Sequence, residues 1–316
     1  MSVAVIAIRA DPPQPYVRSI YNSAPNLFES SAIPSVLQVP LFLVLIPSPL
    51  VDTIQGLFIG TQILPLTQHT HLPDPTAKMP TPPLIIFDFD GTLFNTHASI
   101  KETIKLTFAS LLPASPPPPD AEIEAQIASG AGLADTFRNL YPDAVSSSSP
   151  AEFESWVSKY REIYAERGQA LVTAYPGAKT LLETVQRKGI PMSIISNKGV
   201  EAVKTALVNN GLEGFIPEEF IIGDKTPGAK RKPDVGSFED VLLPRLRDKG
   251  VDLDTEGRRR DMLVVGDTVA DIGFARNLGC RVCWCRYGYG EREECEALRP
   301  DWIVNGLGEV VNILEG

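Results

Sequence analysis

The pattern of apolar residues along the chain becomes regular near residue 84. From there to the C-terminus, short apolar runs alternate with segments whose apolar residues recur at helical spacing. The runs lie at residues 84–88, 191–195, 220–222, 262–266, 281–285 and 302–304. Because they are nearly continuous, they predict strands of a parallel sheet that is buried on both faces.

Helical patterns occupy the intervals between these runs. They lie at residues 177–188, 199–210, 234–249, 270–278 and 292–298. A regular alternation of strand and helix is typical of a doubly wound, Rossmann-like α/β domain, in which helices cover a parallel sheet. This is the predicted fold class of residues 81–95 and 174–316.

One interval is far longer than a crossover helix requires. About 100 residues separate the first predicted strand from the second, and Pro176 onward suffices for the crossover. The preceding residues predict helices at 97–111, 120–128, 132–140 and 150–167. We interpret residues 96–173 as an inserted α-helical cap domain. It would cover the carboxyl ends of the strands, where open α/β sheets bind ligands.

The first eighty residues differ in composition from the rest. Half of the 28 prolines lie in residues 1–83, and this stretch carries only seven charged side chains. Its uncharged segment 30–51 is interrupted by prolines at positions 34, 40, 47 and 49. Each interior proline costs a helix about 3 kcal/mol, which disfavours a membrane span. We expect residues 1–80 to be a poorly ordered extension rather than a domain.

Targeting signals in this extension are weak. No basic residue precedes the apolar run Val3–Ile8, and two arginines are few for a transit peptide. Because the globular pattern starts directly after Met79, we expect the working protein to begin near this residue. The upstream residues would then be a dispensable leader or an error in the predicted coding sequence. We predict a cytoplasmic protein, with a mitochondrial location or a membrane tether at residues 33–66 as alternatives.

Charge and cysteine content narrow the function classes. The formal net charge is −10 and the pI is about 4.9, which argues against nucleic acid or an anionic membrane as partner. Four cysteines are too few for a disulfide scaffold of this length. They all lie late in the chain, at Cys280, Cys283, Cys285 and Cys295. Their spacing leaves two readings open, a zinc site or buried positions on a strand.

Two carboxylates follow the first predicted strand. Asp88 and Asp90 come directly after four apolar residues, so both lie at the end of a buried strand. Charges are costly there unless they are hydrogen-bonded or paired with a metal. Gly91 allows an abrupt turn after them. This segment is therefore the first candidate for chemistry.

Three later segments carry polar groups, two of them at strand ends and one in a loop before a predicted helix. Ser196 and Asn197 end the second strand, where a hydroxyl and free N–H groups before a helix either hold phosphate or simply cap the helix. Lys232 precedes a proline and a predicted helix. Asp267 ends the fourth run, and Asp271 follows one helical turn later. Such an oxygen-rich set suits Mg²⁺.

In this order, the four motifs resemble those of the haloacid dehalogenase superfamily. Over about residues 84–312 the chain is similar to the phosphoglycolate-phosphatase-like group, which has a helical C1-type cap after the first motif. Tyr175–Gly177 resembles the point at which the cap rejoins the core. One departure is Val235, where related sequences often have a second proline after the Lys-Pro pair. It leaves Lys225 and Lys230 as weaker alternatives to Lys232.

The resemblance implies a role for each motif residue. Asp88 is implied as the nucleophile that forms an aspartyl-phosphate, and Asp90 as the general acid and then base. The resemblance also implies that the phosphoryl group is held by Ser196, Asn197 and Lys232. Mg²⁺ would be bound by Asp88, the backbone carbonyl of Asp90, and Asp267, with Asp271 completing or orienting the site.

The predicted function is Mg²⁺-dependent hydrolysis of a small phosphomonoester. Phosphoglycolate is the first expectation, with sugar phosphates and nucleotide monophosphates left open. Asp90 favours phosphate chemistry over dehalogenation, because a leaving halide needs no proton. It does not exclude a phosphomutase of the β-phosphoglucomutase type, and a non-catalytic binding protein is a further alternative. The oligomeric state is not encoded in these motifs.

Two segments outside the motifs have undecided roles. Residues 130–132 and Arg138 of the cap either face the site or form a plain loop and a solvated charge. Residues 287–290, with the sequence Tyr-Gly-Tyr-Gly, either rim the site or form a surface turn.

Overall fold

The computed structural model describes residues 3–4, 46–47, 80–142, 150–253 and 255–315. Strands β1 (Val3–Ala4) and β2 (Ile46–Pro47) pair antiparallel. All other described elements belong to a separate compact unit, His71–Gly316. The expectations for the extension, including the tether at 33–66, fall almost entirely outside the described residues. Within the described ranges, no helix combines the length and the apolar character that crossing a bilayer requires.

Six parallel strands form the central sheet, in the order β10-β9-β8-β3-β6-β7. Their bounds are β3 Ile85–Phe87, β6 Met192–Gly199, β7 Ile221–Asp224, β8 Leu263–Gly266, β9 Arg281–Cys285 and β10 Trp302–Val304. The chain builds outward from β3 to β7 on one side and then from β8 to β10 on the other. The strand order therefore reverses between β3 and β8, the place where such sheets bind ligands.

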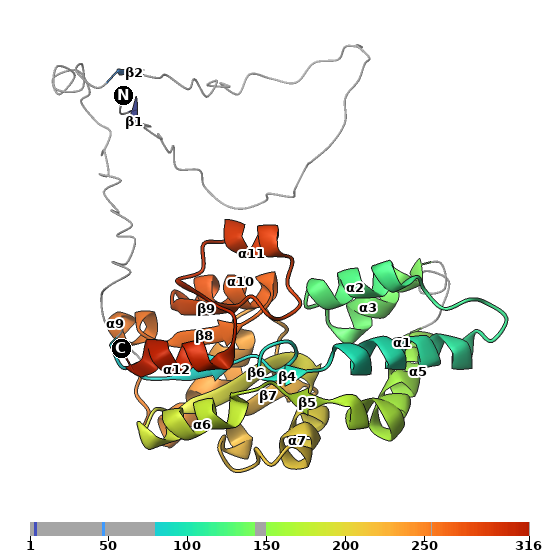
Figure 1. The fold of residues 1–316 in the computed structure, drawn as a ribbon, viewed down its shortest axis with the longest axis horizontal. Helices are drawn as coiled ribbons and strands as arrows, with labels where there is room; N and C mark the ends of the chain where they lie inside the picture. Colours follow the sequence, from blue (N-terminus) through green and yellow to red (C-terminus); the bar gives the residue numbers. More distant parts are fainter. Residues whose placement is uncertain (1–2, 5–45, 48–79, 143–149, 254, 316) are drawn as a thin grey trace, which may run out of the picture. The chain divides into compact units, whose positions relative to one another are not determined.

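Helices cover both faces of this sheet, with α6 and α7 on one side and α10 and α11 on the other (Figure 1). The bounds are α6 Ala178–Arg187, α7 Val200–Asn209, α8 Leu243–Asp248, α9 Glu256–Arg260, α10 Val269–Leu278, α11 Arg292–Ala297 and α12 Leu307–Glu315. The doubly wound α/β fold predicted from the sequence is confirmed. The predicted helix at 234–249 is divided, because π-helical turns at Ser237–Leu242 precede α8. The helices α9 and α12 were missed.

The cap consists of α1 (His97–Leu111), α2 (Asp120–Ala128), α3 (Leu133–Leu140) and α5 (Pro150–Ile163). A π-helical turn at Tyr164–Gly168 and a 3₁₀ turn at Gln169–Leu171 follow α5. The cap helices have an aromatic core of their own. The ring of Trp156 lies 4.9 Å from that of Phe108 and 5.5 Å from that of Phe137, measured between centroids. Such pairs add to the stabilisation from burial.

Two short strands connect the cap to the sheet. Strand β4 (Phe94–Asn95) pairs antiparallel with β5 (Thr173–Ala174), so the chain enters and leaves the cap through one ribbon. Figure 1 shows this ribbon between the sheet and the cap helices. Each strand has two residues, too few for a recognisable pattern in the sequence. The division at 95/96 and 173/174 stays a prediction, because sheet and cap belong to one compact unit.

Candidate active site

The end of β3 places two carboxylates beneath the cap. The backbone N–H of Asp88 donates to the carbonyl of Val265 in β8, at 2.8 Å, and the Asp88 side chain is buried. The chain then turns sharply at Gly91, whose φ of 76° lies in the left-handed region that glycine adopts at low cost. The N–H of Phe94 closes this turn onto the carbonyl of Phe89 at 3.0 Å. Asp90 remains half-buried and lines the cavity below the cap.

Three buried carboxylates meet where the strand order reverses. One oxygen each of Asp88, Asp267 and Asp271 lies within 4.8 Å of the others. Asp88 follows β3, whereas Asp267 follows the adjacent strand β8 and Asp271 lies in the first turn of α10. The sequence predicted all three as metal-site residues, and the fold brings them together.

Lys232 is the cation of this cluster. Its Nζ lies 2.5 Å from Oδ1 of Asp88 and 2.5 Å from Oδ1 of Asp271, and its side chain is 4% exposed. Burial by itself lowers the pKa of Lys232, but Asp271 and Asp88 raise it above its ordinary value, so the ammonium stays charged. The alternatives Lys225 and Lys230 are 60% and 57% exposed. Of the three lysines, Lys232 is therefore the one that contacts Asp88 in the folded protein.

One buried ammonium does not balance three carboxylates. Burial raises the pKa of Asp88 to about 7, and Asp271 and Asp90 add to the rise while Lys232 opposes it. Burial also raises the pKa of Asp267 well above its ordinary value, together with the charges of Asp271 and Asp88. Burial is thus the main cause of both shifts, and the neighbouring carboxylates add to it. An all-oxygen set with excess negative charge fits a hard divalent cation such as Mg²⁺.

Asp271 is held by the helix that carries it. Its Oδ2 accepts hydrogen bonds from the N–H of Thr268 at 2.9 Å, from the Thr268 hydroxyl at 2.8 Å and from the N–H of Asp267 at 3.2 Å. The first of these bonds is half of a capping box at the N-terminus of α10. One oxygen of Asp271 is committed to the helix end and the other to Lys232. Of its two implied roles, these contacts therefore favour the one in which Asp271 orients the metal site.

Residues 287–290 wrap around Asp267, which decides between the two roles left open for this segment. The N–H of Tyr289 donates to Oδ2 of Asp267 at 2.8 Å, and the Thr92 hydroxyl donates to Oδ1 at 3.0 Å. The Trp284 indole N–H donates to the Asp267 backbone carbonyl at 2.8 Å. Sequence reasoning missed Thr92 and Trp284, since each stands far from Asp267 along the chain.

Tyr289 also reaches the entry to the cap. Its hydroxyl accepts a hydrogen bond from the N–H of Thr96 at 2.6 Å, directly before α1. The Tyr287 hydroxyl donates to the carbonyl of Thr92 at 2.7 Å. The loop that holds Asp267 therefore also holds the chain between the first motif and the cap.

Replacing Gly288 with alanine tests this packing. A Cβ at Gly288 would overlap the Asp267 side chain, so either the loop or the carboxylate must shift. We expect Gly288→Ala to cost about 1–3 kcal/mol of stability, as overpacking usually does, and to reduce Mg²⁺ affinity. Thermal denaturation with and without Mg²⁺ measures both effects. In the control Gly306→Ala, the added Cβ meets no atom within 4 Å. Equal behaviour of the two variants would show that the close approach of the loop is unimportant.

The second motif lies beside Lys232. The N–H of Lys232 donates to Oδ1 of Asn197 at 2.9 Å, and the Asn197 amide donates to the cap carbonyl of Gly130 at 3.1 Å. Asn197 thus links Lys232 to the cap. Ser196 is 6% exposed and lines the cavity, and its Oγ accepts from the N–H of Lys198 at 3.3 Å.

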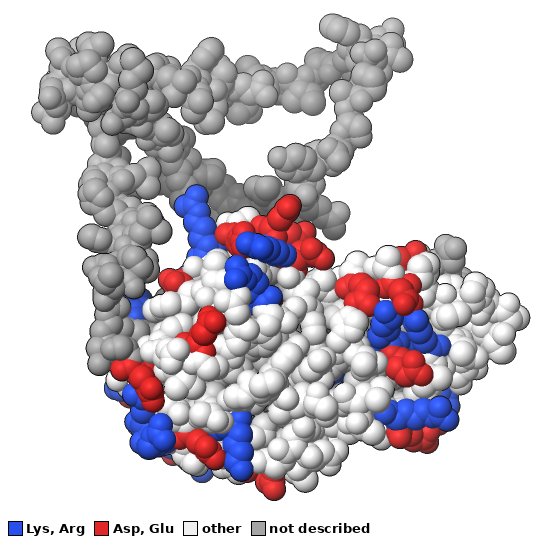
Figure 2. Space-filling model, viewed as in Figure 1, with Lys and Arg blue, Asp and Glu red and all other residues white. Residues whose placement is uncertain are grey.

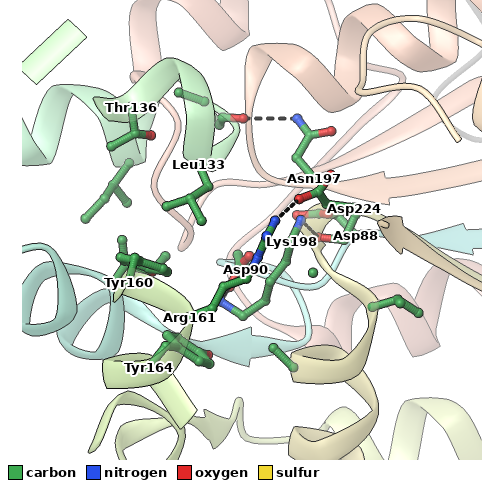
Figure 3. A pocket seen from close by; sticks show the side chains of 18 of the residues that line it. Asp88, Asp90, Leu133, Thr136, Tyr160, Arg161, Tyr164, Asn197, Lys198 and Asp224 are labelled. Carbon is green, nitrogen blue, oxygen red and sulfur yellow. Dashed lines mark hydrogen bonds and ion pairs between the residues drawn. The ribbon is translucent and has the colours of Figure 1, made fainter. Parts of the chain in front are cut away.

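A cavity of about 390 Å³ extends from the carboxylates to the cap. Asp88, Asp90, Ser196 and Lys232 line its core side. The cap side is largely apolar and includes Ile100, Ile104, Ile127, Leu133, Tyr160 and Tyr164. Figure 3 shows the labelled cap residues facing those of the core across this space. The volume lies in the range of small-molecule sites.

Ion pairs join the cap to the core around the cavity. Arg161 of α5 lies 2.8 Å from Asp224 at the end of β7, and Arg231 lies 2.9 Å from Asp135 of α3. Of the undecided cap residues, Gly130 and its neighbour Ala131 line the cavity. Arg138 is half exposed and pairs with Asp135 at 2.8 Å, as a surface charge does.

The four cysteines are buried free thiols. Cys283 and Cys285 lie within β9, and burial raises the pKa of both thiols. Each therefore holds its proton at neutral pH.

On the face drawn in Figure 2, Lys and Arg are interspersed with Asp and Glu rather than gathered into a basic patch.

Comparison of the sequence with known proteins points to the same kind of site. A family model described as haloacid dehalogenase-like hydrolase matches residues 85–285, and the chain belongs to this family. The phosphoglycolate phosphatase of Vibrio parahaemolyticus is 28% identical over 235 residues, which are 73% of this chain and 95% of that protein. PpaX of Clostridium perfringens, a candidate pyrophosphatase, is 25% identical over 231 residues, which are 73% of this chain and 96% of that protein.

Solved structures support the fold. A structure from Haemophilus somnus, described as a predicted phosphoglycolate phosphatase, has a TM-score of 0.60 at 21% identity and covers 74% of this chain and 99% of its own. The resemblance inferred from the four motifs is confirmed, and so is the enzyme class, a phosphatase-type hydrolase.

Proposed function

We propose that the protein is a Mg²⁺-dependent phosphomonoesterase acting on a small phosphorylated metabolite through an aspartyl-phosphate. Phosphoglycolate, the substrate in the name of the Vibrio parahaemolyticus relative, is the first candidate. The proposal is carried by one observation. Asp88, Asp267, Asp271 and Lys232 converge, all buried, beneath a capped cavity.

Asp88 would attack phosphorus and release the alcohol. A carboxylate and a phosphate repel each other, so the attack requires positive charge at the site. The ammonium of Lys232, 2.5 Å from Asp88, supplies part of this positive charge. It would hold the phosphoryl group together with Ser196. Asp90 lines the same cavity and would protonate the leaving oxygen, then take a proton from the water that hydrolyses the aspartyl-phosphate.

The carboxylates would hold the metal. Asp88, Asp267 and the backbone carbonyl of Asp90 are the proposed ligands, and Asp271 orients them through Lys232 and α10. When bound, Mg²⁺ neutralises the phosphate and offsets the excess negative charge of the cluster.

Product analysis tests the proposal against its two alternatives. Phosphomonoesters, including phosphoglycolate, sugar phosphates and nucleotide monophosphates, are incubated with the protein in Mg²⁺ or in chelator. We expect Mg²⁺-dependent release of inorganic phosphate without isomerised product. An isomerised sugar phosphate would identify a phosphomutase, whereas binding without turnover would identify a binding protein.

The pKa shifts predict a pH-dependent effect of Mg²⁺ on stability. The folded-state pKa of Asp88 is about 7, above the ordinary 3.8 of an unfolded aspartate. The stability this group contributes is therefore complete below about pH 4 and is lost as the pH rises through 7. A cation that binds the ionised carboxylates restores it. We expect Mg²⁺ to raise the melting temperature more at about pH 8 than at about pH 6; an equal rise at both would contradict the assignment.

A further inference from the structure

Lys198 is a second buried cation in the cavity, separate from the Lys232 cluster. Its side chain is 8% exposed, and its Nζ lies 3.1 Å from Oδ1 of Asp90 and 4.4 Å from the ring centroid of Tyr164. Figure 3 shows Lys198 among Asp90, Arg161 and Tyr164, between core and cap. No motif required a lysine here, and the resemblance assigned it no role.

The ammonium is charged and incompletely partnered. Burial alone lowers the pKa of Lys198, but the Asp90 carboxylate raises it above the ordinary value. An ammonium has three N–H donors, and Asp90 is the sole carboxylate within ion-pair distance in the described part of the chain. The other nearby cations are committed, Lys232 to Asp88 and Asp271, and Arg161 to Asp224.

Two buried oxygens lie beside Lys198 and have no hydrogen-bond partner other than its ammonium. These are Oδ1 of Asp90, which meets Lys198 only as an ion pair, and the hydroxyl of Tyr164. Tyr164 is 5% exposed and lines the cavity. Buried polar groups are normally hydrogen-bonded, because an unpaired one costs about 1–3 kcal/mol. A cation and a hydroxyl donor left unsatisfied in one cavity indicate a missing anionic ligand.

The position of Lys198 limits where that anion can lie in the substrate. Asp90 is the group proposed to contact the ester oxygen, and Lys198 lies within 3.1 Å of it. The anion must therefore be only a few bonds from the ester oxygen. Farther along the cap, the wall is mainly apolar and includes Ile104, Ile127 and Leu133. Arg161, the cation that the described residues contribute to this wall, is already paired with Asp224, so a more distant charge would be poorly compensated.

We propose that Lys198, with the Tyr164 hydroxyl, binds a carboxylate of the substrate next to the ester oxygen, and that the enzyme thereby selects short 2-phosphooxy carboxylates. The inference rests on the proposed phosphatase function and adds the specificity-determining residue.

Two substrates that differ in one charge provide the test. Phosphoglycolate carries the carboxylate, and its carboxamide analogue has nearly the same shape without the charge. We expect the wild-type kcat/KM to favour phosphoglycolate by about 10–100-fold, as a charge-assisted hydrogen bond allows. In Lys198→Met this ratio should fall to near one. Any effect of the mutation through Asp90 acts on both substrates and cancels in the ratio.

Further variants sharpen the result. Tyr164→Phe retains the ring beneath Lys198 and should reduce the ratio by about 3–10-fold. The matched control Lys225→Met removes a lysine at the mouth of the same cavity, 60% exposed, and should leave the ratio unchanged.

The outcomes separate this inference from the proposed function. A wild-type ratio near one, or a ratio unchanged in Lys198→Met, would overturn the role of Lys198 while leaving the phosphatase intact. Activity on the carboxamide also shows that each variant is folded. Failure of the wild type to release phosphate from either ester would instead refute the phosphatase function itself.

Discussion

Replacing Asp88 with asparagine is expected to abolish phosphate release, with kcat falling by at least about 10³-fold. The amide retains the shape of the side chain but cannot attack phosphorus to form an acyl phosphate. Phosphate release at saturating substrate and Mg²⁺ measures the loss. Because covalent attack by Asp88 would be the first chemical step, every substrate should be affected alike.

The same variant should remain folded. Asparagine keeps an oxygen beside Lys232 and removes one of three crowded buried charges, so the metal-free melting temperature should match or exceed that of the wild type. Asp248→Asn, at the exposed C-terminal end of α8, is the matched control and should change neither quantity. If Asp88→Asn kept more than about a tenth of the activity, another residue would have to be the nucleophile.

Replacing Lys232 with methionine is expected to reduce both rate and stability. The change leaves the carboxylates of Asp88 and Asp271 buried without their cation, and breaking a buried pair in this way costs about 3–5 kcal/mol. Loss of a fixed charge at the phosphoryl group should lower kcat/KM by about 10²–10³-fold. Chemical denaturation and steady-state kinetics measure the two effects.

Mg²⁺ separates the two roles of Lys232. The metal can replace the lost charge against the carboxylates, so it should restore much of the stability of Lys232→Met but little of its rate. Full recovery of both would reduce Lys232 to a structural cation. Lys230→Met is the control, because that lysine is exposed and lies 4.0 Å from Asp234, away from the cluster. A slower reaction in this control alone would favour the alternative assignment of the motif.

The elements of the fold could be predicted wherever their signal is local. Strand β3 was visible because Leu84–Phe87 are all apolar, which a strand at the centre of a sheet requires. The cap helices α1 and α2 were predicted at their observed bounds from apolar spacing and the prolines between them. The ribbon of β4 and β5 was not, because two-residue strands have no period and their pairing joins residues far apart in the chain.

The sequence by itself determined which residues stand at the strand ends, since three of the four motifs directly follow an apolar run. The Lys232 motif instead lies in the loop before a predicted helix. Only the tertiary structure decided what those residues touch. Lys198 was adjacent to a motif and was passed over, because the groups that make it notable, Asp90 and Tyr164, come from the first motif and the cap. Tyr289 was left undecided because its bond to Asp267 depends on how the loop after β9 folds back. Contacts between distant segments depend on packing, and no local pattern of apolar and polar residues encodes them.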